Sequence, residues 1–170
     1  MKRMWSPWRS QHIGNTSAEG LNEVNRPDLF RRIAEESDDE ANLVVWRGDR
    51  VYVVMNRFPY NNGHLLIVPY RQVENYEDLD EEEMVEVARV IADCIQWLRA
   101  ALEPEGFNVG MNLGPAGGAG VPEHLHVHVV PRWSGDTNFM PTVADIKIIP
   151  ESMQDTFRKI REAVRASGGG

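Results

Sequence analysis

The sequence predicts an α+β domain built on an antiparallel meander of about five strands, with one long helix and a C-terminal helix. Short runs of β-branched and apolar residues are joined by loops of hairpin length rather than by helices. One long segment has helical periodicity, and a second amphipathic segment follows residue 150. The length of 170 residues and the composition, 42% hydrophobic and 26% charged, are typical of one globular domain.

We expect the chain to have three parts. These are an N-terminal arm with a short helix over 1–40, a central domain over 41–150, and a C-terminal helix and tail over 151–170. In the first part, Pro27 to Glu36 is predicted to form the short helix, with Leu29, Ile33 and Ala34 facing inward. The acidic run at 35–40 is expected to be solvated.

The central part contains the strands. They are predicted at 42–47, 51–56, 64–70, 106–114 and 123–133. Gly48 and Asp49 separate the first two strands, and such a short polar connection indicates a hairpin. Beyond the last strand, Ile146 to Ile149 is apolar, and a helix from Pro150 is expected to point Met153, Phe157, Ile160 and Val164 inward.

Residues 80–102 carry the strongest helix signal in the chain. Asp80 and Glu83 make a D-x-x-E opening that is related to the capping box. The apolar stripe that follows consists of Met84, Val87, Ala88, Ile91, Cys94, Ile95, Leu98 and Leu102. Cys94 is the sole cysteine and is predicted to be a small buried residue. One cysteine excludes an internal disulfide and a thiolate zinc cluster, which fits a reducing compartment.

The charge of the chain narrows the class of partner. Its formal net charge of -8 argues against non-specific binding of nucleic acid or of an anionic membrane. No signal peptide is indicated, and the purely apolar runs are too short to span a bilayer. We therefore expect a cytoplasmic protein, and a locally cationic or amide-rich pocket could still bind a phosphorylated small molecule.

The stretch "EHLHVHVVPRW" at 123–133 places histidines at every second position. In an extended strand His124, His126 and His128 share one face, and Leu125, Val127 and Val129 share the other, which we predict to face the core. Imidazoles are poor packing material, because each ring has two nitrogens that need partners.

Three interpretations of the histidine row remain open from the residues alone. It could be a polar, solvent-facing strand without chemistry. It could bind a metal, but Glu123 points to the other face and the remaining histidines are His12 and His64. It could supply a nucleophile towards phosphorus, with mutual repulsion keeping the rings neutral. The loop "NLGPAGGAGVPE" before the row either presents backbone N–H groups to phosphate or is a mobile connection without a Walker lysine.

These residues resemble a known family. "HLHVHVV" fits the His-φ-His-φ-His-φ-φ signature of the histidine triad family of nucleotide hydrolases and transferases. "MNRFPYNNGHLLIVPYR" at 55–71 is similar to the nucleotide-binding segment of that family. The run from "GFNVGMNLG" to "SGDTNF", with "MWSPWR" and "KIIPE", resembles the bacterial branch that cleaves diadenosine tetraphosphate, phosphorylases included. The resemblance implies the histidine triad fold.

The resemblance also implies roles for individual residues. His126 would attack the α-phosphorus and become a nucleotidyl-histidine, His128 would hydrogen-bond phosphate oxygens, and His124 and His64 would support them. The residues expected to bind the nucleotide and its phosphates are Asn56 at the ribose, Arg57, Asn112, Gly118, Gly120 and Val121. Some relatives have Gln where this chain has Gly120, so the handling of the leaving group is expected to depend on backbone donors here. Arg132 is a further candidate for offsetting phosphate charge.

The resemblance also bears on metals and partners. Several relatives hold a structural zinc, but this chain has "RPDLFRR" and Gln72 where the ligands would be, so we predict no structural zinc and no protein-bound cofactor. Magnesium could arrive with the nucleotide. The expected partners are a nucleotide substrate, inorganic phosphate or water, and a second copy of the chain, against which Trp5 and Trp8 could pack instead of packing on their own domain.

The predicted activity is phosphorolysis of diadenosine tetraphosphate to ADP and ATP. Hydrolysis of the same substrate and hydrolysis of nucleoside phosphoramidates are the neighbouring alternatives. A metal-dependent enzyme that uses the histidine row and a non-catalytic nucleotide-binding module are alternatives of another class. No sequence feature distinguishes water from phosphate as the acceptor.

Overall fold

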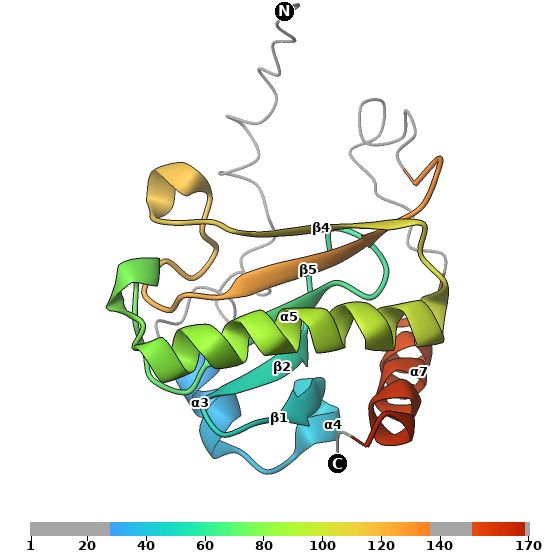
Figure 1. The fold of residues 1–170 in the computed structure, drawn as a ribbon, viewed down its shortest axis with the longest axis horizontal. Helices are drawn as coiled ribbons and strands as arrows, with labels where there is room; N and C mark the ends of the chain where they lie inside the picture. Colours follow the sequence, from blue (N-terminus) through green and yellow to red (C-terminus); the bar gives the residue numbers. More distant parts are fainter. Residues whose placement is uncertain (1–27, 137–150, 169–170) are drawn as a thin grey trace, which may run out of the picture.

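The computed structural model of the chain describes residues 28–136 and 151–168. Its centre is a five-stranded antiparallel sheet in the order β1-β2-β3-β5-β4 (Figure 1). The strands are β1 (Val44–Arg47), β2 (Val51–Met55), β3 (Leu65–Pro69), β4 (Gly106–Met111) and β5 (Val127–Arg132). The predicted α+β meander is confirmed.

Helices flank the sheet. They are α3 (Leu29–Glu35), α4 (Asp39–Asn42), α5 (Glu81–Leu102) and α7 (Met153–Ala166), with short 3-10 turns η1 (Tyr76–Asp78) and η2 (Pro115–Gly117). In Figure 1, α5 runs along the sheet, and α7 packs near the C-terminal end of α5 and against β1. No helix in the described ranges is long and apolar enough to cross a membrane.

Two strands begin later than the sequence predicts. The first begins at Val44, because Asn42 ends α4 and Leu43 turns the chain with a left-handed φ of 59°. The last begins at Val127, so His124 and His126 precede it. The β3–β5 ladder ends at the pair Ile67–Val127, and Leu125 instead donates its N–H to the Val73 carbonyl at 2.7 Å.

The long helix starts as predicted but its buried face is rotated. Asp80 and Glu83 form a complete capping box. Cys94 is fully buried, as predicted. Ala88, however, is exposed, and the buried face instead includes Val90 and Trp97, which we had not assigned to it.

A buried carboxylate on α5 holds the turn between the first two strands. Glu86 is 5% exposed, and its two oxygens accept hydrogen bonds from the backbone N–H of Asp49 and Arg50 at 3.0 and 2.9 Å. These bonds compensate for burial of the charge, because an unpaired carboxylate would be costly there. The predicted hairpin at Gly48 and Asp49 is therefore confirmed and is tied to α5.

The N-terminal helix faces the core through a different residue than expected. Phe30 and Ile33 are buried, whereas Leu29 and Ala34 are partly buried. The Tyr52 hydroxyl donates to the Phe30 carbonyl at 2.7 Å and anchors α3 on the sheet.

The acidic run is not solvated throughout. Asp39 accepts from Arg47 at 2.8 Å and lies 3.7 Å from Arg161 of α7, while most of its neighbours are exposed.

The C-terminal helix is confirmed, with Phe157, Ile160 and Val164 buried and Met153 partly buried. Ser152 caps its N-terminus. The expectations for Trp5, Trp8 and the apolar run at 146–149 lie outside the described residues.

Candidate active site

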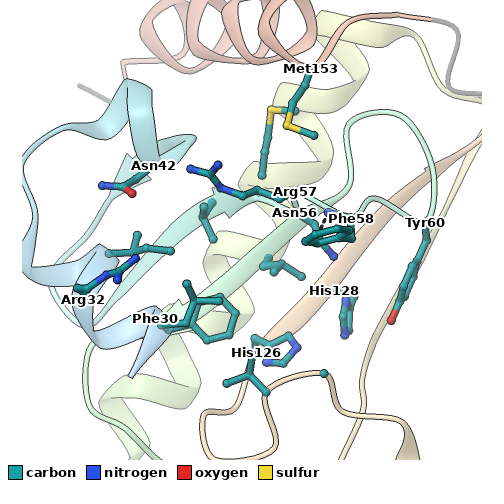
Figure 2. A pocket seen from close by; sticks show the side chains of 17 residues that line it. Phe30, Arg32, Asn42, Asn56, Arg57, Phe58, Tyr60, His126, His128 and Met153 are labelled. Atoms are coloured by element: carbon teal, nitrogen blue, oxygen red, sulfur yellow. Dashed lines mark hydrogen bonds between the residues drawn. The ribbon is translucent and has the colours of Figure 1, made fainter. Parts of the chain in front are cut away.

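A cavity of about 570 Å³ opens on one face of the sheet. In the paired strands Val54, Leu66 and His128 form one cross-strand row, so their side chains share that face. Figure 2 shows His126 and His128 at one side of the cavity, and Arg57 and Met153 at the opposite side. The lining combines an apolar wall with these polar groups, as small-molecule sites do.

The histidine row is buried rather than exposed to solvent. His124 is 0%, His126 6% and His128 7% exposed. The solvent-facing interpretation is therefore wrong. On the opposite face Val127 and Val129 lie in the main core, as predicted. Leu125 instead belongs to a separate small cluster with Val73 and Leu79.

Hydrogen bonds to backbone carbonyls determine which ring nitrogen carries the proton in His124 and His126. His126 Nδ1 lies 2.8 Å from the His124 carbonyl, and His124 Nε2 lies 2.8 Å from the Pro69 carbonyl. A carbonyl accepts only, so each of these ring nitrogens carries the proton when the ring is neutral. His126 then has a lone pair on Nε2, and this residue lines the cavity.

A hydrogen bond from a backbone N–H determines which ring nitrogen carries the proton in His64 and, through it, in His128. The Tyr60 N–H donates to His64 Nδ1 at 3.0 Å, so His64 carries its proton on Nε2. His64 Nε2 lies 2.9 Å from His128 Nδ1, which must therefore accept. The proton of neutral His128 is consequently on Nε2. The row thus presents a ring-nitrogen lone pair at His126 and an N–H donor at His128, with ring centroids 4.9 Å apart.

Burial keeps these rings neutral. Desolvation first, and the neighbouring His128 and His126 second, lower the pKa of His64 to about 3. Desolvation and then His126 lower the pKa of His128 to about 4. Burial also lowers the pKa of His124 and of His126, although in each case the bond to a backbone carbonyl acts in the opposite direction. We had attributed neutrality to mutual repulsion, but burial is the larger cause.

Two aromatic residues that the sequence did not single out complete the histidine site. Phe30 of α3 lies 5.6 Å from the His124 ring and 5.1 Å from the His126 ring. Tyr60 stacks on the other side, 4.6 Å from His64 and 5.4 Å from His128. Their signal in the sequence is weak, because each lies well away from the triad along the chain.

The predicted nucleotide-binding residues are distributed around the cavity. Asn112 does not line the cavity itself but lies behind His128, with Nδ2 3.3 Å from His128 Nε2. Asn56 accepts from the Phe58 N–H at 2.9 Å and lies 3.3 Å from His64 Nδ1. Gly120 and Val121 line the cavity, whereas Gly118 does not.

The two arginines are placed differently from what charge balance suggests. Arg57 lines the cavity but lies at the side away from the histidines, where it donates to the Ala41 carbonyl at 2.6 Å (Figure 2). Arg132 forms a bidentate pair with Asp136 and also bonds Asn108, and it does not line the cavity. Its predicted role at the phosphates is not supported by this placement.

Within 28–136 and 151–168, no group of three His, Cys, Asp or Glu side chains is arranged to hold a metal ion. Gln72, at the position where relatives would need a zinc ligand, bonds the Glu123 carbonyl through Nε2 at 3.3 Å. The described histidine nitrogens are mostly committed to one another and to the backbone, which leaves His126 Nε2 as the available lone pair facing the cavity.

Comparison with known proteins agrees with this geometry. Residues 37–135 match the HIT domain family model. The chain is 41% identical over 160 residues to the AP-4-A phosphorylase of Mycobacterium tuberculosis, covering 93% of this chain and 82% of the relative. It is 32% identical over 111 residues to the bis(5'-adenosyl)-triphosphatase of Saccharomyces cerevisiae, covering 65% of this chain and 51% of that protein.

The fold is also similar to that of a solved structure. A Zn-bound histidine triad family protein from Mycobacterium smegmatis superposes with a TM-score of 0.66 at 24% identity, over 82% of this chain and 94% of that one. The family match covers the histidine row, and the phosphorylase relative matches 93% of this chain. The chain belongs to the HIT domain family and, within it, to the AP-4-A phosphorylase-like branch.

Proposed function

We propose that the protein cleaves dinucleoside polyphosphates through a nucleotidyl-His126 intermediate, with diadenosine tetraphosphate as substrate and inorganic phosphate as acceptor. The observation that carries the proposal is the proton assignment of His126. Its Nδ1–H bonds the His124 carbonyl, which leaves a lone pair on Nε2 in the wall of the cavity. A neutral imidazole held in this way is an activated nucleophile.

The first step forms a bond between His126 Nε2 and the α-phosphorus. The bond from the α-phosphorus to the bridging oxygen breaks, and the leaving nucleotide takes the electron pair. The imidazole ring then carries positive charge, so its Nδ1–H bond to the His124 carbonyl becomes charge-assisted and strengthens. The His128 Nε2–H is available as a donor to the phosphoryl oxygens, on which negative charge is concentrated.

The second step is the reverse displacement with a new acceptor. An oxygen of inorganic phosphate attacks the α-phosphorus, and His126 leaves as neutral imidazole with its Nδ1 proton retained. The products of the two steps are ATP and ADP. Attack by water would give AMP instead, so the identity of the acceptor distinguishes a phosphorylase from a hydrolase.

The comparisons support the substrate class. The phosphorylase relative shares 41% identity over 93% of this chain, and its name specifies AP-4-A. A second relative is named for the cleavage of a bis(5'-adenosyl) triphosphate. Both names describe dinucleoside polyphosphates.

We also propose that the protein acts in the cytoplasm as a homodimer, without nucleic acid and without a protein-bound cofactor. Magnesium would enter with the nucleotide. Strand β4 supports the dimer, because it lies at the edge of the sheet and exposes Val109 at 44%. Light scattering of the purified protein tests the dimer, and a mass of one chain would contradict it.

The proposed activity is tested by product analysis. The protein is incubated with diadenosine tetraphosphate, with and without inorganic phosphate. ADP and ATP formed in the presence of phosphate support phosphorolysis, and AMP and ATP in its absence indicate hydrolysis. Label from the substrate should be trapped on the wild type but not on His126→Gly. Binding without any cleavage or labelling would instead favour a non-catalytic nucleotide-binding module.

A further inference from the structure

Tyr60 lines the cavity at its histidine end, and its hydroxyl takes no part in the two steps described above. The side chain is 50% exposed, lines the cavity and comes from the loop between β2 and β3. Its ring is held by two histidines, at 4.6 Å from His64 and, nearly parallel at 21°, 5.4 Å from His128. Its backbone N–H is fixed by the bond to His64 Nδ1. A tyrosine held at both its ring and its backbone has a preorganised hydroxyl.

The Tyr60 hydroxyl accepts a hydrogen bond from Asn112, so its own O–H proton is left to donate to another group. Asn112 Nδ2 lies 3.4 Å from the Tyr60 hydroxyl and 3.3 Å from His128 Nε2. Because His64 donates to His128 Nδ1, the Nε2 of neutral His128 carries a proton and cannot accept from Asn112. The amide and the imidazole therefore present N–H groups to the same space, an arrangement that is complementary to an anionic oxygen.

These groups extend from His128 through Asn112 to Tyr60, away from the proposed nucleophile His126. Figure 2 shows His128 between His126 and Tyr60, with the Tyr60 hydroxyl at the far side. An α-phosphoryl group on His126 would lie at the His128 end of these groups. The next phosphoryl group along a polyphosphate would then lie towards Asn112 and Tyr60.

We propose that the Tyr60 hydroxyl and Asn112 form the subsite for the phosphoryl group next to the α-phosphate. This inference rests on the proposed function and specifies how its acceptor is bound. The subsite holds the terminal phosphate of the departing ATP in the first step. By microscopic reversibility it holds inorganic phosphate in the second step, when an oxygen of that phosphate bonds to the α-phosphorus and His126 leaves. Attack by water on the nucleotidyl-enzyme does not depend on these hydrogen-bond donors.

The test uses Tyr60→Phe, which keeps the ring stacked on the histidines and removes the hydroxyl. The nucleotidyl-enzyme is formed with diadenosine tetraphosphate, separated from substrate, and chased with increasing inorganic phosphate. We expect the variant to need roughly tenfold more phosphate for half-maximal formation of ADP, as for loss of one hydrogen bond to a charged group. Release of AMP by water should decrease much less than formation of ADP. Tyr76→Phe, an exposed tyrosine of η1 away from the cavity, is the matched control and should behave as wild type.

Equal phosphate dependence in Tyr60→Phe and wild type would overturn the subsite. So would an equal loss of both ADP and AMP formation, because that pattern indicates general damage to the histidines. A wild type that forms no nucleotidyl-enzyme would instead refute the proposed function. In that case the subsite is tested directly by calorimetric titration with inorganic phosphate, where binding to wild type that is unchanged in Tyr60→Phe would overturn it.

Discussion

The hydrogen-bonded pair of His64 and His128 predicts a steep loss of stability in mild acid. His64 and His128 are 0% and 7% exposed, and burial lowers their pKa values to about 3 and about 4. In the unfolded chain both rings return to an ordinary pKa of about 6.5. Below that pH the unfolded state therefore binds protons that the folded state does not, and the free energy of unfolding decreases as the pH falls.

The magnitude follows from the two pKa shifts. Each histidine contributes about 1.4 kcal/mol per pH unit once the pH is below the unfolded pKa and above the folded one. From about pH 7 to about pH 5 the pair should therefore cost roughly 4 kcal/mol of stability. Whole domains typically have free energies of unfolding of about 5–15 kcal/mol, so this loss is a large part of the total. Above the unfolded pKa the contribution of the pair should be constant.

The assay is urea unfolding at a series of pH values, followed by tryptophan fluorescence. Trp97 is a suitable reporter, because it is buried 5.9 Å from Trp46. The control is His64→Gln, whose amide can donate to His128 but does not titrate. The carboxylates that also titrate in this range are common to both proteins. The difference between the two slopes of unfolding free energy against pH therefore reports the titration of His64. We expect the wild-type slope to exceed that of the variant by about 1.4 kcal/mol per pH unit. Parallel curves would refute the reasoning.

Three further substitutions test the parts that support the site. Phe30→Ala should reduce the free energy of unfolding by about 3–5 kcal/mol and weaken nucleotide binding, and Phe30→Leu should lose much less, as urea unfolding and calorimetry can check. Glu86→Ala leaves two turn N–H groups without their acceptor and should cost about 2–3 kcal/mol in unfolding experiments, with Glu86→Gln intermediate; an unchanged Tm would contradict the anchoring role. Gly63 has φ +73° and an added Cβ would lie 2.4 Å from a leucine side chain, so Gly63→Ala should lower Tm, whereas Gly110→Ala, where nothing lies within 4 Å, should not.

Much of the fold follows from local pattern in the sequence. The capping box at Asp80, the hairpin at Gly48 and the alternation of the histidine strand are short-range signals, and each corresponds to a feature of the structure. Where the prediction failed, the cause lies in tertiary contacts. Ala88 and Trp97 both fit a helical stripe approximately, but Trp97 packs against Trp46 of β1 whereas Ala88 is exposed.

The site was predictable in its residues and less so in its surroundings. Alternation places the three histidines on one face, but it cannot tell whether that face is covered. Phe30 and Tyr60 lie against it and come from a helix and a loop that are distant in sequence, so burial of the row was missed. Charge alone could not separate Arg57, which lines the cavity and donates to a backbone carbonyl, from Arg132, which pairs with Asp136 away from the cavity.

The three histidines of the row begin as chemical equals, and backbone groups make them different. Burial lowers the pKa of each of them and so explains neutrality, but it cannot decide which nitrogen holds the proton. At His126 the neighbouring group is a carbonyl, which draws the proton to Nδ1 and leaves the lone pair in the cavity. At His128 the chain of bonds begins at the Tyr60 N–H and passes through His64, which sends the proton to Nε2 instead. One backbone acceptor and one backbone donor thus place opposite groups on the two Nε2 atoms, a lone pair at His126 and an N–H at His128. His64→Ala, which removes the donor to His128 Nδ1, should therefore weaken phosphate binding in a calorimetric titration more than His64→Gln, while the bond that fixes the lone pair of His126 stays in place.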